Sequence, residues 1–347
     1  MIGRRQALLL GGSALAAAAI SRSPAWAQDA VAKLYEEAKK EGEVTWYIAH
    51  YTTETAESVG RDFSEKFPGV KCNVVRTTAQ VAYQRLLQDI KNSSSVCDVF
   101  SSTDEGHYVR LKGEKRFAQY SPPNASKLLP QFKEVDPDGV YFPTAAGMNV
   151  LVYKTDKVKP EDAPKNWTDL LDPKWKGQIA TGHPGFSGYV GTWVVQMRKL
   201  YGWDFFTKLE KNKPQIGRSV NDPVTVLNSG ERIVGVSGSN TVGLSASKGN
   251  PIAISYATDG SVLMPTPSAV MANAPHPSAA RLLMNYLLGE DHARVSVAEF
   301  GYPVIAGIDP PKGLKGLNEI KVIRPTTQEV VKGIPAVIEE WRDTFGN

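Results

Sequence analysis

The strongest constraint on the fold is a strict alternation of strand-like and helix-like segments in the first third of the chain. Apolar runs such as VTWYIAH are typical of buried parallel strands, and amphipathic segments separate them. With connections this short, each helix has to cross over the sheet, which predicts an α/β fold with a mainly parallel sheet flanked by helices. The predicted order is helix 30–40, strand 44–50, helix 52–67, strand 70–76, helix 80–91 and strand 96–100.

A second α/β block follows without a flexible linker. Residues 138–155 hold two apolar β-like stretches and a glycine, and a helix is predicted over 327–345 at the end of the chain. The segments near 145–153 and 256–264 are candidate crossings between the blocks. Two blocks joined in this way are expected to move about the crossings as a hinge.

Residues 1–27 are typical of a secretory signal peptide. Arg4 and Arg5 precede an apolar run over 7–20, and Ala25-Trp26-Ala27 fits a small-x-small cleavage site. The paired arginines also allow a twin-arginine signal, and an uncleaved anchor is the alternative to cleavage. The apolar run is shorter than the roughly 20 residues of a membrane span, which favours export into the periplasm.

The remaining composition excludes some partners. Cleavage would remove Arg4, Arg5 and Arg22 and no acidic residue, which lowers the formal net charge of +4 by three. Nothing basic enough remains to indicate nucleic acid as a partner. Cys72 and Cys97 lie in predicted strands that flank a third strand, about 10 Å apart. A disulfide needs Cα atoms within about 7 Å, so both are predicted to be free thiols.

No catalytic motif stands out in the sequence. There is no HExxH, no Walker A and no GxSxG; the string around Ser187 is G-F-S-G, which lacks the last spaced glycine. The five histidines stand singly, without metal-ligand spacing, and His107 and His292 are interpreted as surface helical positions. We therefore expect no enzyme and no cofactor, with an exported hydrolase using Ser187 as an alternative.

Hydroxyl-rich turns recur where a predicted strand meets a helix. In parallel α/β sheets the ligand site lies beyond the carboxyl ends of the strands, and helix N-termini there favour anions. One such turn is only a helix cap, but four turns in two blocks predict a binding cleft. The four turns are residues 50–53, 76–78, 101–103 and 186–189.

Five segments in order resemble the type II periplasmic solute-binding proteins of ABC importers, in the group that includes ferric-ion-binding proteins. The resemblance implies a two-lobed fold that closes on a small molecule, a membrane permease of an ABC importer as partner, a monomer, and no catalysis. It also implies lobe 1 over 28–145 and 265–305, and lobe 2 over 146–264 and 306–347. The segments are LVYKTDKV (151–158), NWTDLLDPKWKGQIA (166–180), LNSGERIVGVSGSN (227–240), APHPSAARLLMNYLLGED (274–291) and GYPV (301–304).

The resemblance also bears on the ligand. Where ferric-binding members have an adjacent tyrosine pair, this chain has Ser239-Asn240-Thr241, and only His50 resembles a ligand in the first loop. The position of that group's synergistic anion is matched by Ser187-Gly188-Tyr189. The implied ligand is therefore a small organic anion: a carboxylate, a phosphonate or a phosphate ester.

The candidate ligand-binding residues come from both lobes, and Arg76 or Arg218 is expected to neutralise the anion. A metal-binding protein using His50 remains an alternative. So does a binder of a polyamine or thiamine-like cation, using Asp104, Asp222 and Asp259. The predicted ligand-binding residues are Tyr51, Thr52, Thr78, Ser102 and Thr103 in lobe 1, and Ser187, Gly188, Tyr189, Asn221, Ser239, Asn240 and Asp259 in lobe 2.

Overall fold

One ten-stranded sheet runs through residues 24–346, the part of the chain that the computed structural model describes. Its order is β2-β1-β3-β9-β4-β7-β5-β6, with β10 paired to β9 and β8 paired to β4. The strands are β1 (Glu43–Ile48), β2 (Lys71–Arg76), β3 (Val99–Ser101), β4 (Phe142–Lys154), β5 (Ile179–Thr181), β6 (Gln215–Ile216), β7 (Val234–Gly238), β8 (Ile252–Ser255), β9 (Ser261–Val270) and β10 (Val322–Ile323).

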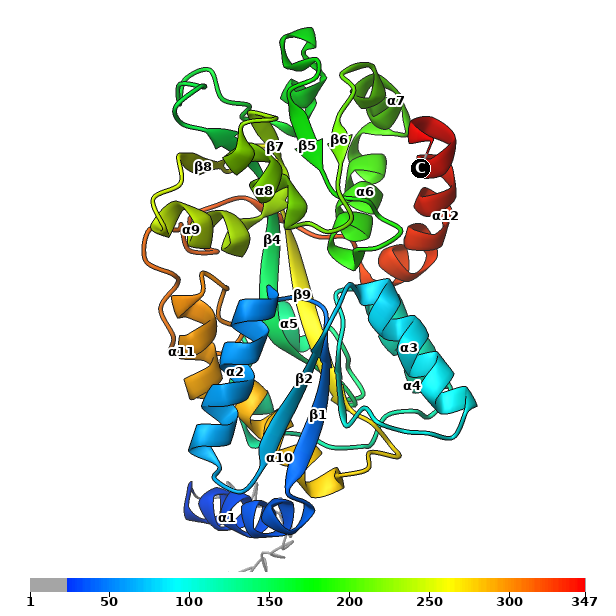
Figure 1. Ribbon diagram of the computed structural model, residues 1–347, viewed down its shortest axis with the longest axis vertical. Helices are drawn as coiled ribbons and strands as arrows, with labels where there is room; N and C mark the ends of the chain where they lie inside the picture. Colours follow the sequence, from blue (N-terminus) through cyan, green and yellow to red (C-terminus); the bar gives the residue numbers. More distant parts are fainter. Residues whose placement is uncertain (1–23, 347) are drawn as a thin grey trace, which may run out of the picture.

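The sheet is parallel in its outer parts and antiparallel at its centre. Strand β1 pairs in parallel with β2 and β3, and β5 pairs in parallel with β6 and β7, as the alternation of strands and helices predicts. Strands β4 and β9 pair antiparallel with each other between these groups. Figure 1 shows that both extend across the lower and upper halves of the molecule. The two halves are therefore connected by continuous strands.

Residues 138–155 differ from the prediction of two β-like stretches. They contain a single strand of 13 residues, β4, in which every side chain is buried. Pro143 and Gly147 do not end the strand; the register against β9 shifts at a bulge between Pro143 and Ala145. A bulge accommodates the irregularity that the sequence pattern suggested as a break.

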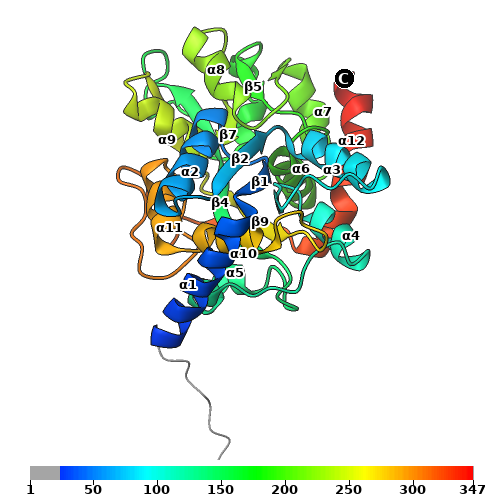
Figure 2. The ribbon, with the colours of Figure 1, turned by 60° about the horizontal axis from the view of Figure 1, so that its bottom comes forward.

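Helices cover both faces of the sheet (Figures 1 and 2). The final helix, α12, has the predicted bounds; it begins with a capping box between Thr326 and Glu329 and packs on α6 in the upper half. The helices are α1 (Pro24–Glu41), α2 (Thr53–Lys66), α3 (Ala79–Lys91), α4 (Glu105–Gly113), α5 (Pro130–Lys133), α6 (Gly188–Tyr201), α7 (Asp204–Lys211), α8 (Asp222–Ser229), α9 (Ser239–Ser247), α10 (Pro277–Leu287), α11 (Glu290–Ala298) and α12 (Thr327–Phe345); Pro123–Lys127, Trp167–Leu171 and Pro173–Trp175 are 3₁₀ turns.

Several apolar clusters stabilise the described residues, and one of them extends from the lower half into α8 and α9 of the upper half. Trp46 and Phe63 are fully buried between the lower sheet and its helices, and Trp167, Trp193 and Trp341 are fully buried in the upper half. Trp341 belongs to α12, so the end of the chain completes the upper core. Burying a large apolar side chain contributes about 1.5–3 kcal/mol, which makes these aromatic residues major contributors to stability.

Both cysteines are free, as predicted. Cys72 lies on β2 and Cys97 precedes β3, with β1 between the two strands. Burial raises the pKa of the Cys72 thiol to about 12, so this thiol stays protonated and behaves as a small apolar group.

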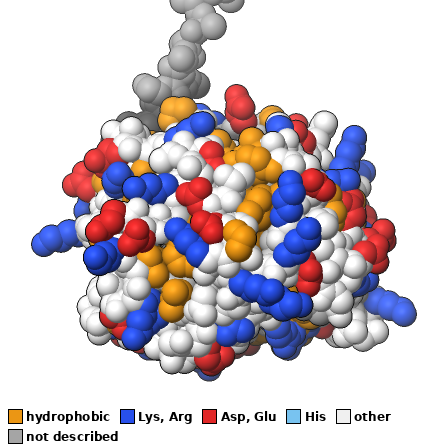
Figure 3. Space-filling model, turned by 90° about the horizontal axis from the view of Figure 1, so that it is seen from above, with side chains coloured by type: hydrophobic (Ala, Val, Ile, Leu, Met, Phe, Trp, Pro, Cys, Tyr) orange, Lys and Arg blue, Asp and Glu red, His pale blue; other side chains and the backbone are white. Residues whose placement is uncertain are grey.

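The signal-peptide prediction falls mostly on residues outside the described part of the chain, and residues 24–27 open α1. None of the helices in the described residues is both long enough and apolar enough to span a membrane. Figure 3 shows basic and acidic side chains interspersed over the face seen from above. The predicted lobe boundaries remain a prediction.

Candidate ligand-binding site

The predicted cleft lies between the two halves, at the carboxyl ends of β1, β2 and β3. The helices α3 and α4 begin there, and the first turns of α6 and α8 face them from the upper half. This is the edge at which parallel strands direct their following loops toward a ligand. The cleft therefore occurs where the hydroxyl-rich turns predicted it.

A narrow cavity lies between the two sets of loops. Its volume is about 10 Å³, which is room for about one water molecule, so the two halves are nearly in contact. We call the lining residues between 49 and 103 the first wall, and those between 186 and 221 the second wall. The lining residues are Ala49, His50, Arg76, Thr78, Ala79, Thr103, Phe186, Ser187, Tyr189, Ser219, Val220 and Asn221.

Five of the twelve predicted residues line this cavity: Thr78, Thr103, Ser187, Tyr189 and Asn221. The structure brings these five together from distant parts of the sequence. The remaining seven lie outside the lining; they are Tyr51, Thr52, Ser102, Gly188, Ser239, Asn240 and Asp259.

Arg76 is the positive charge of the cavity. Its Nε donates to the carbonyl oxygen of Tyr51 at 2.7 Å, and no carboxylate of the described residues forms an ion pair with it. Burial lowers the pKa of the guanidinium, an effect that the nearby Asp222 partly opposes, but arginine stays charged. Arg218, the other arginine considered, stacks on the Phe186 ring at 4.7 Å and does not line the cavity.

The start of α6 approaches the first wall very closely. The Ser187 Oγ caps the helix by accepting from the Val190 amide at 3.4 Å. A Cβ atom on Gly188 would lie 2.4 Å from the Thr103 carbonyl oxygen, which is closer than real Cβ atoms come. The absence of a side chain at Gly188 therefore allows the two halves to meet.

A buried ion pair joins the halves beside the cleft. Glu105, at the start of α4, accepts from the Arg324 guanidinium at 2.8 and 2.9 Å, and the Thr327 hydroxyl also donates to it. Burial raises the pKa of the Glu105 carboxyl, and the positive charge of Arg324 opposes this. The pair connects α4 to the segment that leads into α12.

Three residues predicted as ligand-binding in lobe 1 lie outside the cavity lining and bond to other parts of the protein. The Tyr51 hydroxyl is bonded to His292 Nε2 at 3.2 Å and to Ser296 Oγ at 3.1 Å, and burial raises the pKa of this phenol. Thr52 caps α2 by accepting from the Thr55 amide. Ser102 is fully buried, with its Oγ 2.8 Å from His107 Nδ1.

The prediction that His107 and His292 are surface residues is wrong, because their exposed fractions are 6% and 1%. Each ring packs against an aromatic residue, His107 against Tyr83 and His292 against Tyr51. Burial lowers the pKa of both imidazoles, to about 4 for His292. Helical position alone did not reveal that these polar rings face the core.

The polar groups of the second wall bond mainly to their own half. The Asn221 Oδ1 accepts from Thr241 Oγ1 at 2.6 Å, and the Ser219 hydroxyl donates to Asp222 at 2.6 Å. The Tyr189 hydroxyl is bonded to Thr266, and burial raises its pKa. These bonds fix the wall and leave few of its side-chain groups for a ligand.

The predicted ligand-binding residues 239, 240 and 259 lie in the upper half, outside the cavity lining. Ser239 and Asn240 open α9, and Ser239 is fully buried. Asp259 accepts from the Trp167 amide at 3.0 Å and from the Tyr201 hydroxyl, so it holds the loops of the upper half together. None of the three lines the cavity.

The cavity lining contains no acidic residue. Of the aspartates proposed for a cation, Asp104 caps α4 and accepts from Gln80, Asp222 accepts from the backbone of Arg218 and Ser219, and Asp259 is placed as described. Within the described residues, no group of three or more His, Cys, Asp or Glu residues could hold a metal ion. The chemistry of the cleft is therefore that of one guanidinium, one imidazole, hydroxyl groups, an amide and a helix start.

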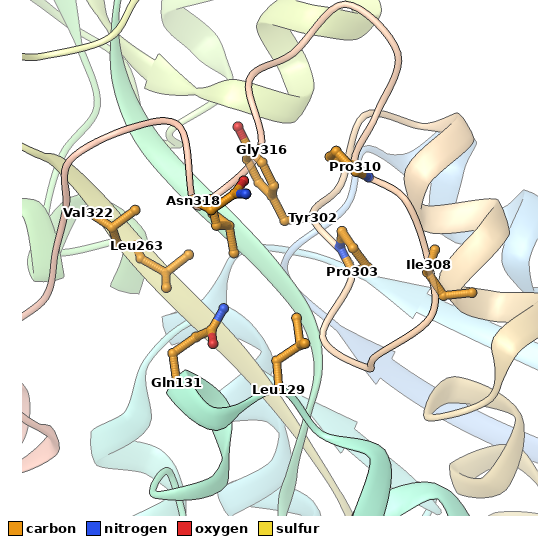
Figure 4. A pocket seen from close by; sticks show the side chains of 11 residues that line it. Leu129, Gln131, Leu263, Tyr302, Pro303, Ile308, Pro310, Gly316, Asn318 and Val322 are labelled. Atoms are coloured by element: carbon orange, nitrogen blue, oxygen red, sulfur yellow. The ribbon is translucent and has the colours of Figure 1, made fainter.

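A second cavity, of about 490 Å³, lies away from this cleft, beside β9 and the loop that precedes β10. Figure 4 shows its side chains, most of them apolar, with the amides of Gln131 and Asn318 as polar groups. Its lining has no charged side chain, so it offers nothing to neutralise an anion. The lining residues are Leu129, Gln131, Leu263, Tyr302, Pro303, Ile308, Pro310, Gly316, Leu317, Asn318 and Val322.

Comparisons with known proteins bear on the family and the fold. A family model described as bacterial extracellular solute-binding protein matches residues 94–330. A Salmonella typhimurium periplasmic protein, named for 2-aminoethylphosphonate binding, is 23% identical over 341 residues, covering 93% of this chain and 94% of that protein.

Two solved structures are similar over most of the chain. The periplasmic binding protein AfuA of Actinobacillus pleuropneumoniae, with fructose-6-phosphate bound, has a TM-score of 0.79 at 20% identity and covers 88% of this chain and 99% of its own. Iron-bound HitA of Pseudomonas aeruginosa has a TM-score of 0.75 at 19% identity, covering 87% and 99%. These likenesses confirm the predicted two-lobed type II periplasmic binding protein fold.

Proposed function

The chain belongs to the bacterial extracellular solute-binding proteins, and on this premise we propose that it binds a small organic anion in the cleft between its two halves. Proteins of this family bind small ligands for ABC permeases in the periplasm and are not enzymes. The expectation of an importer component without catalytic activity is therefore confirmed. The ligand class, the site residues and the closing motion form the proposal.

The observation that carries the proposal is the charge balance of the cavity. Arg76 lines it without an ion-paired carboxylate in the described residues, and no acidic side chain is part of the lining. The start of α6 adds backbone N–H groups and the positive end of a helix dipole from the opposite wall. An anion held between them would gain charge-assisted hydrogen bonds from both halves.

Phosphonates and phosphate esters are the favoured anions. The names of two similar proteins refer to 2-aminoethylphosphonate and fructose-6-phosphate, both of which carry a phosphorus-centred anion on a polar carbon skeleton. Three oxygens around phosphorus suit a site with donors on two walls. Carboxylates remain within the proposed class.

The alternatives lack the groups they would require. Ferric iron favours anionic oxygen ligands, whereas the two phenols nearest the cleft, Tyr51 and Tyr189, have raised pKa values and bond to other side chains. A polyamine would need carboxylates, and Asp104, Asp222 and Asp259 bond elsewhere. The anion is therefore preferred over both.

Closure is proposed to occur about β4 and β9. In this proposal lobe 1 comprises 28–145 and 265–305, and lobe 2 comprises 146–264 and 306–347. A ligand that contacts both walls at once favours the closed arrangement, because its contacts are complete only there. The contact of Gly188 with Thr103 supports such an arrangement. In this proposal the protein is a monomer, and residues 1–27 are a signal peptide that is removed on export.

A thermal-shift and calorimetry screen tests the proposal. The purified protein is tested with methylphosphonate, 2-aminoethylphosphonate, fructose-6-phosphate, citrate, spermidine and Fe³⁺. A ligand at 100 times its Kd stabilises the folded state by about 2.7 kcal/mol, which raises the melting temperature by several degrees. Stabilisation by a phosphonate, phosphate ester or carboxylate supports the proposal. Stabilisation only by spermidine or Fe³⁺ contradicts it.

A further inference from the structure

His50 has an unusual position among the buried polar residues. Its ring lies just beyond the end of β1 and lines the cleft cavity, with an exposed fraction of 4%. Neither ring nitrogen has a hydrogen-bond partner in the described residues 24–346. Buried polar groups without partners cost free energy and are rare, so this ring needs an explanation.

The other four histidines are bonded within the protein. His107 pairs with Ser102, His276 with Asp98 and His292 with the Tyr51 hydroxyl, and His183 accepts from the Gly185 amide. These bonds explain why those rings are where they are. His50 differs in lining the cleft and in lacking any such bond.

The surroundings of His50 hold its ring in place without using its nitrogens. The Tyr51 ring lies 4.2 Å away and the Trp46 ring 6.3 Å away, measured between ring centroids. Thr78 lines the same wall, and its Oγ1 also lacks a partner in the described residues. The first wall thus presents two unpaired polar groups beside the Arg76 guanidinium.

The His50 ring is neutral. Burial lowers its pKa well below the usual 6.5, and electrostatic interactions with His292 and with the positive charge of Arg76 lower it further. A neutral imidazole has one nitrogen that donates and one that accepts. Its acceptor nitrogen requires a donor on the ligand, which a deprotonated phosphonate oxygen does not offer.

We infer that His50 is a specificity-determining residue of the cleft, which hydrogen bonds to a hydroxyl or amino substituent of the ligand while Arg76 binds the anionic group. The inference rests on the proposed function and narrows its ligand class. The preferred ligand is an organic anion with a polar substituent near the charged group. A plain alkyl anion of the same size leaves the acceptor nitrogen of the imidazole unpaired and binds more weakly.

Three nearly isosteric phosphonates test the inference. Propylphosphonate, 2-hydroxyethylphosphonate and 2-aminoethylphosphonate differ only in a terminal methyl, hydroxyl or ammonium group. Titration calorimetry on the natural protein should give at least one polar compound a Kd about tenfold or more below that of propylphosphonate. In His50→Phe this preference should fall below about twofold, with propylphosphonate binding retained.

Two further variants make the test specific. His292→Phe makes the same change in a buried ring that does not line the cavity, and it should keep the preference. His50→Gln retains a donor and an acceptor, so it should keep part of the preference and serves if His50→Phe fails to fold.

The outcomes separate the inference from the proposed function. Equal affinity of the natural protein for all three compounds overturns the inference and leaves an anion site standing. The same conclusion follows if the preference survives in His50→Phe. Absence of binding to all three phosphonates overturns the inference, and only the screen against the other anions then decides the proposed function.

Discussion

The two walls of the cleft differ in how their polar groups are used. In the first wall, the half-buried Arg76 guanidinium, the buried His50 ring and the Thr78 hydroxyl lie beside the cavity with bonds left to make. In the second wall, the side chains of Ser187, Ser219 and Asn221 already bond within their own half, and the Tyr189 hydroxyl bonds to Thr266 on the central strand β9.

The two walls are therefore expected to play different parts in ligand recognition. The first wall offers side chains whose charge and hydrogen-bonding groups can discriminate between ligands. The second wall offers a fixed surface, the N–H groups at the start of α6 and the close approach at Gly188. Substitutions in the first wall should therefore change affinity and selectivity, and those in the second wall should act through closure or stability.

The largest effect is expected from Arg76→Met, which keeps much of the side-chain volume and removes the charge. Loss of a charge-assisted bond to a buried anion should raise the Kd for 2-aminoethylphosphonate about 100-fold or more in calorimetry. Arg218→Met is the control, because that guanidinium stacks on Phe186 outside the cavity lining, and it should change the Kd less than threefold. An equal increase of the Kd in both variants would contradict the proposal that Arg76 binds the anion.

Acid pH should destabilise the folded protein through His292. The folded-state pKa of His292 is about 4, below its usual 6.5, because burial disfavours the charged ring. Below pH 6.5 the unfolded state therefore binds more protons, and stability falls with pH until about pH 4. At pH 5 this one group should cost about 2 kcal/mol.

Urea unfolding at pH 7 and pH 5 measures this loss. His292→Phe removes the titrating ring, so the difference in unfolding free energy between the two pH values should shrink by about 2 kcal/mol. An unchanged difference would mean that the His292 ring titrates normally in the folded protein.

Gly188→Ala should hold the walls apart. The new Cβ would lie 2.4 Å from the Thr103 carbonyl oxygen, so full closure requires a backbone shift. We expect the Kd to rise about tenfold with no loss of thermal stability, since alanine is the better helix former. Gly113→Ala on α4 meets no atom within 4 Å and should leave the Kd unchanged. Small-angle scattering that showed no ligand-induced compaction in the natural protein would contradict closure itself.

The smallest effect on affinity is expected from Ser187→Ala. Its Oγ already accepts from the Val190 amide, so the variant should lose about 1 kcal/mol of stability as a missing helix cap. The Kd should change less than about threefold, since the N–H groups of α6 remain. Thr326→Ala removes a matched cap on α12 away from the lining and should lower the melting temperature alone. A large loss of affinity only in Ser187→Ala would mean that the hydroxyl contacts the ligand directly.

Much of the fold was predictable from local pattern. Strands β1 and β2 and the helices α2, α3 and α12 lie within a few residues of the predicted bounds, because buried strands and capped amphipathic helices have strong local signals. The single long strand β4 was missed, since Pro143 and Gly147 suggest a break. Its continuity depends on pairing with β9 and β7 on either side, which the local sequence does not contain.

The position of the cavity between the halves was predictable, but only some of its lining residues were. The rule that ligands bind beyond strand ends located the cleft, and Thr78, Thr103 and Ser187 line it. The sequence did not distinguish Arg76 from Arg218, and it indicated His50 only as a ligand in the metal-binding alternative. Whether a side chain at a strand end turns to the cleft or to the core depends on packing, as the fully buried Ser102 illustrates.

The pairing of β3 with β9 has a consequence for how the chain acquires its structure. Val99 pairs with Val270, so the last strand of the first parallel group stays an open edge until a much later segment is available. Long-range pairing of this kind slows folding and prevents a contiguous N-terminal fragment from completing its own sheet. Two halves that act as separate bodies in the proposed closure are thus expected to form in one cooperative event.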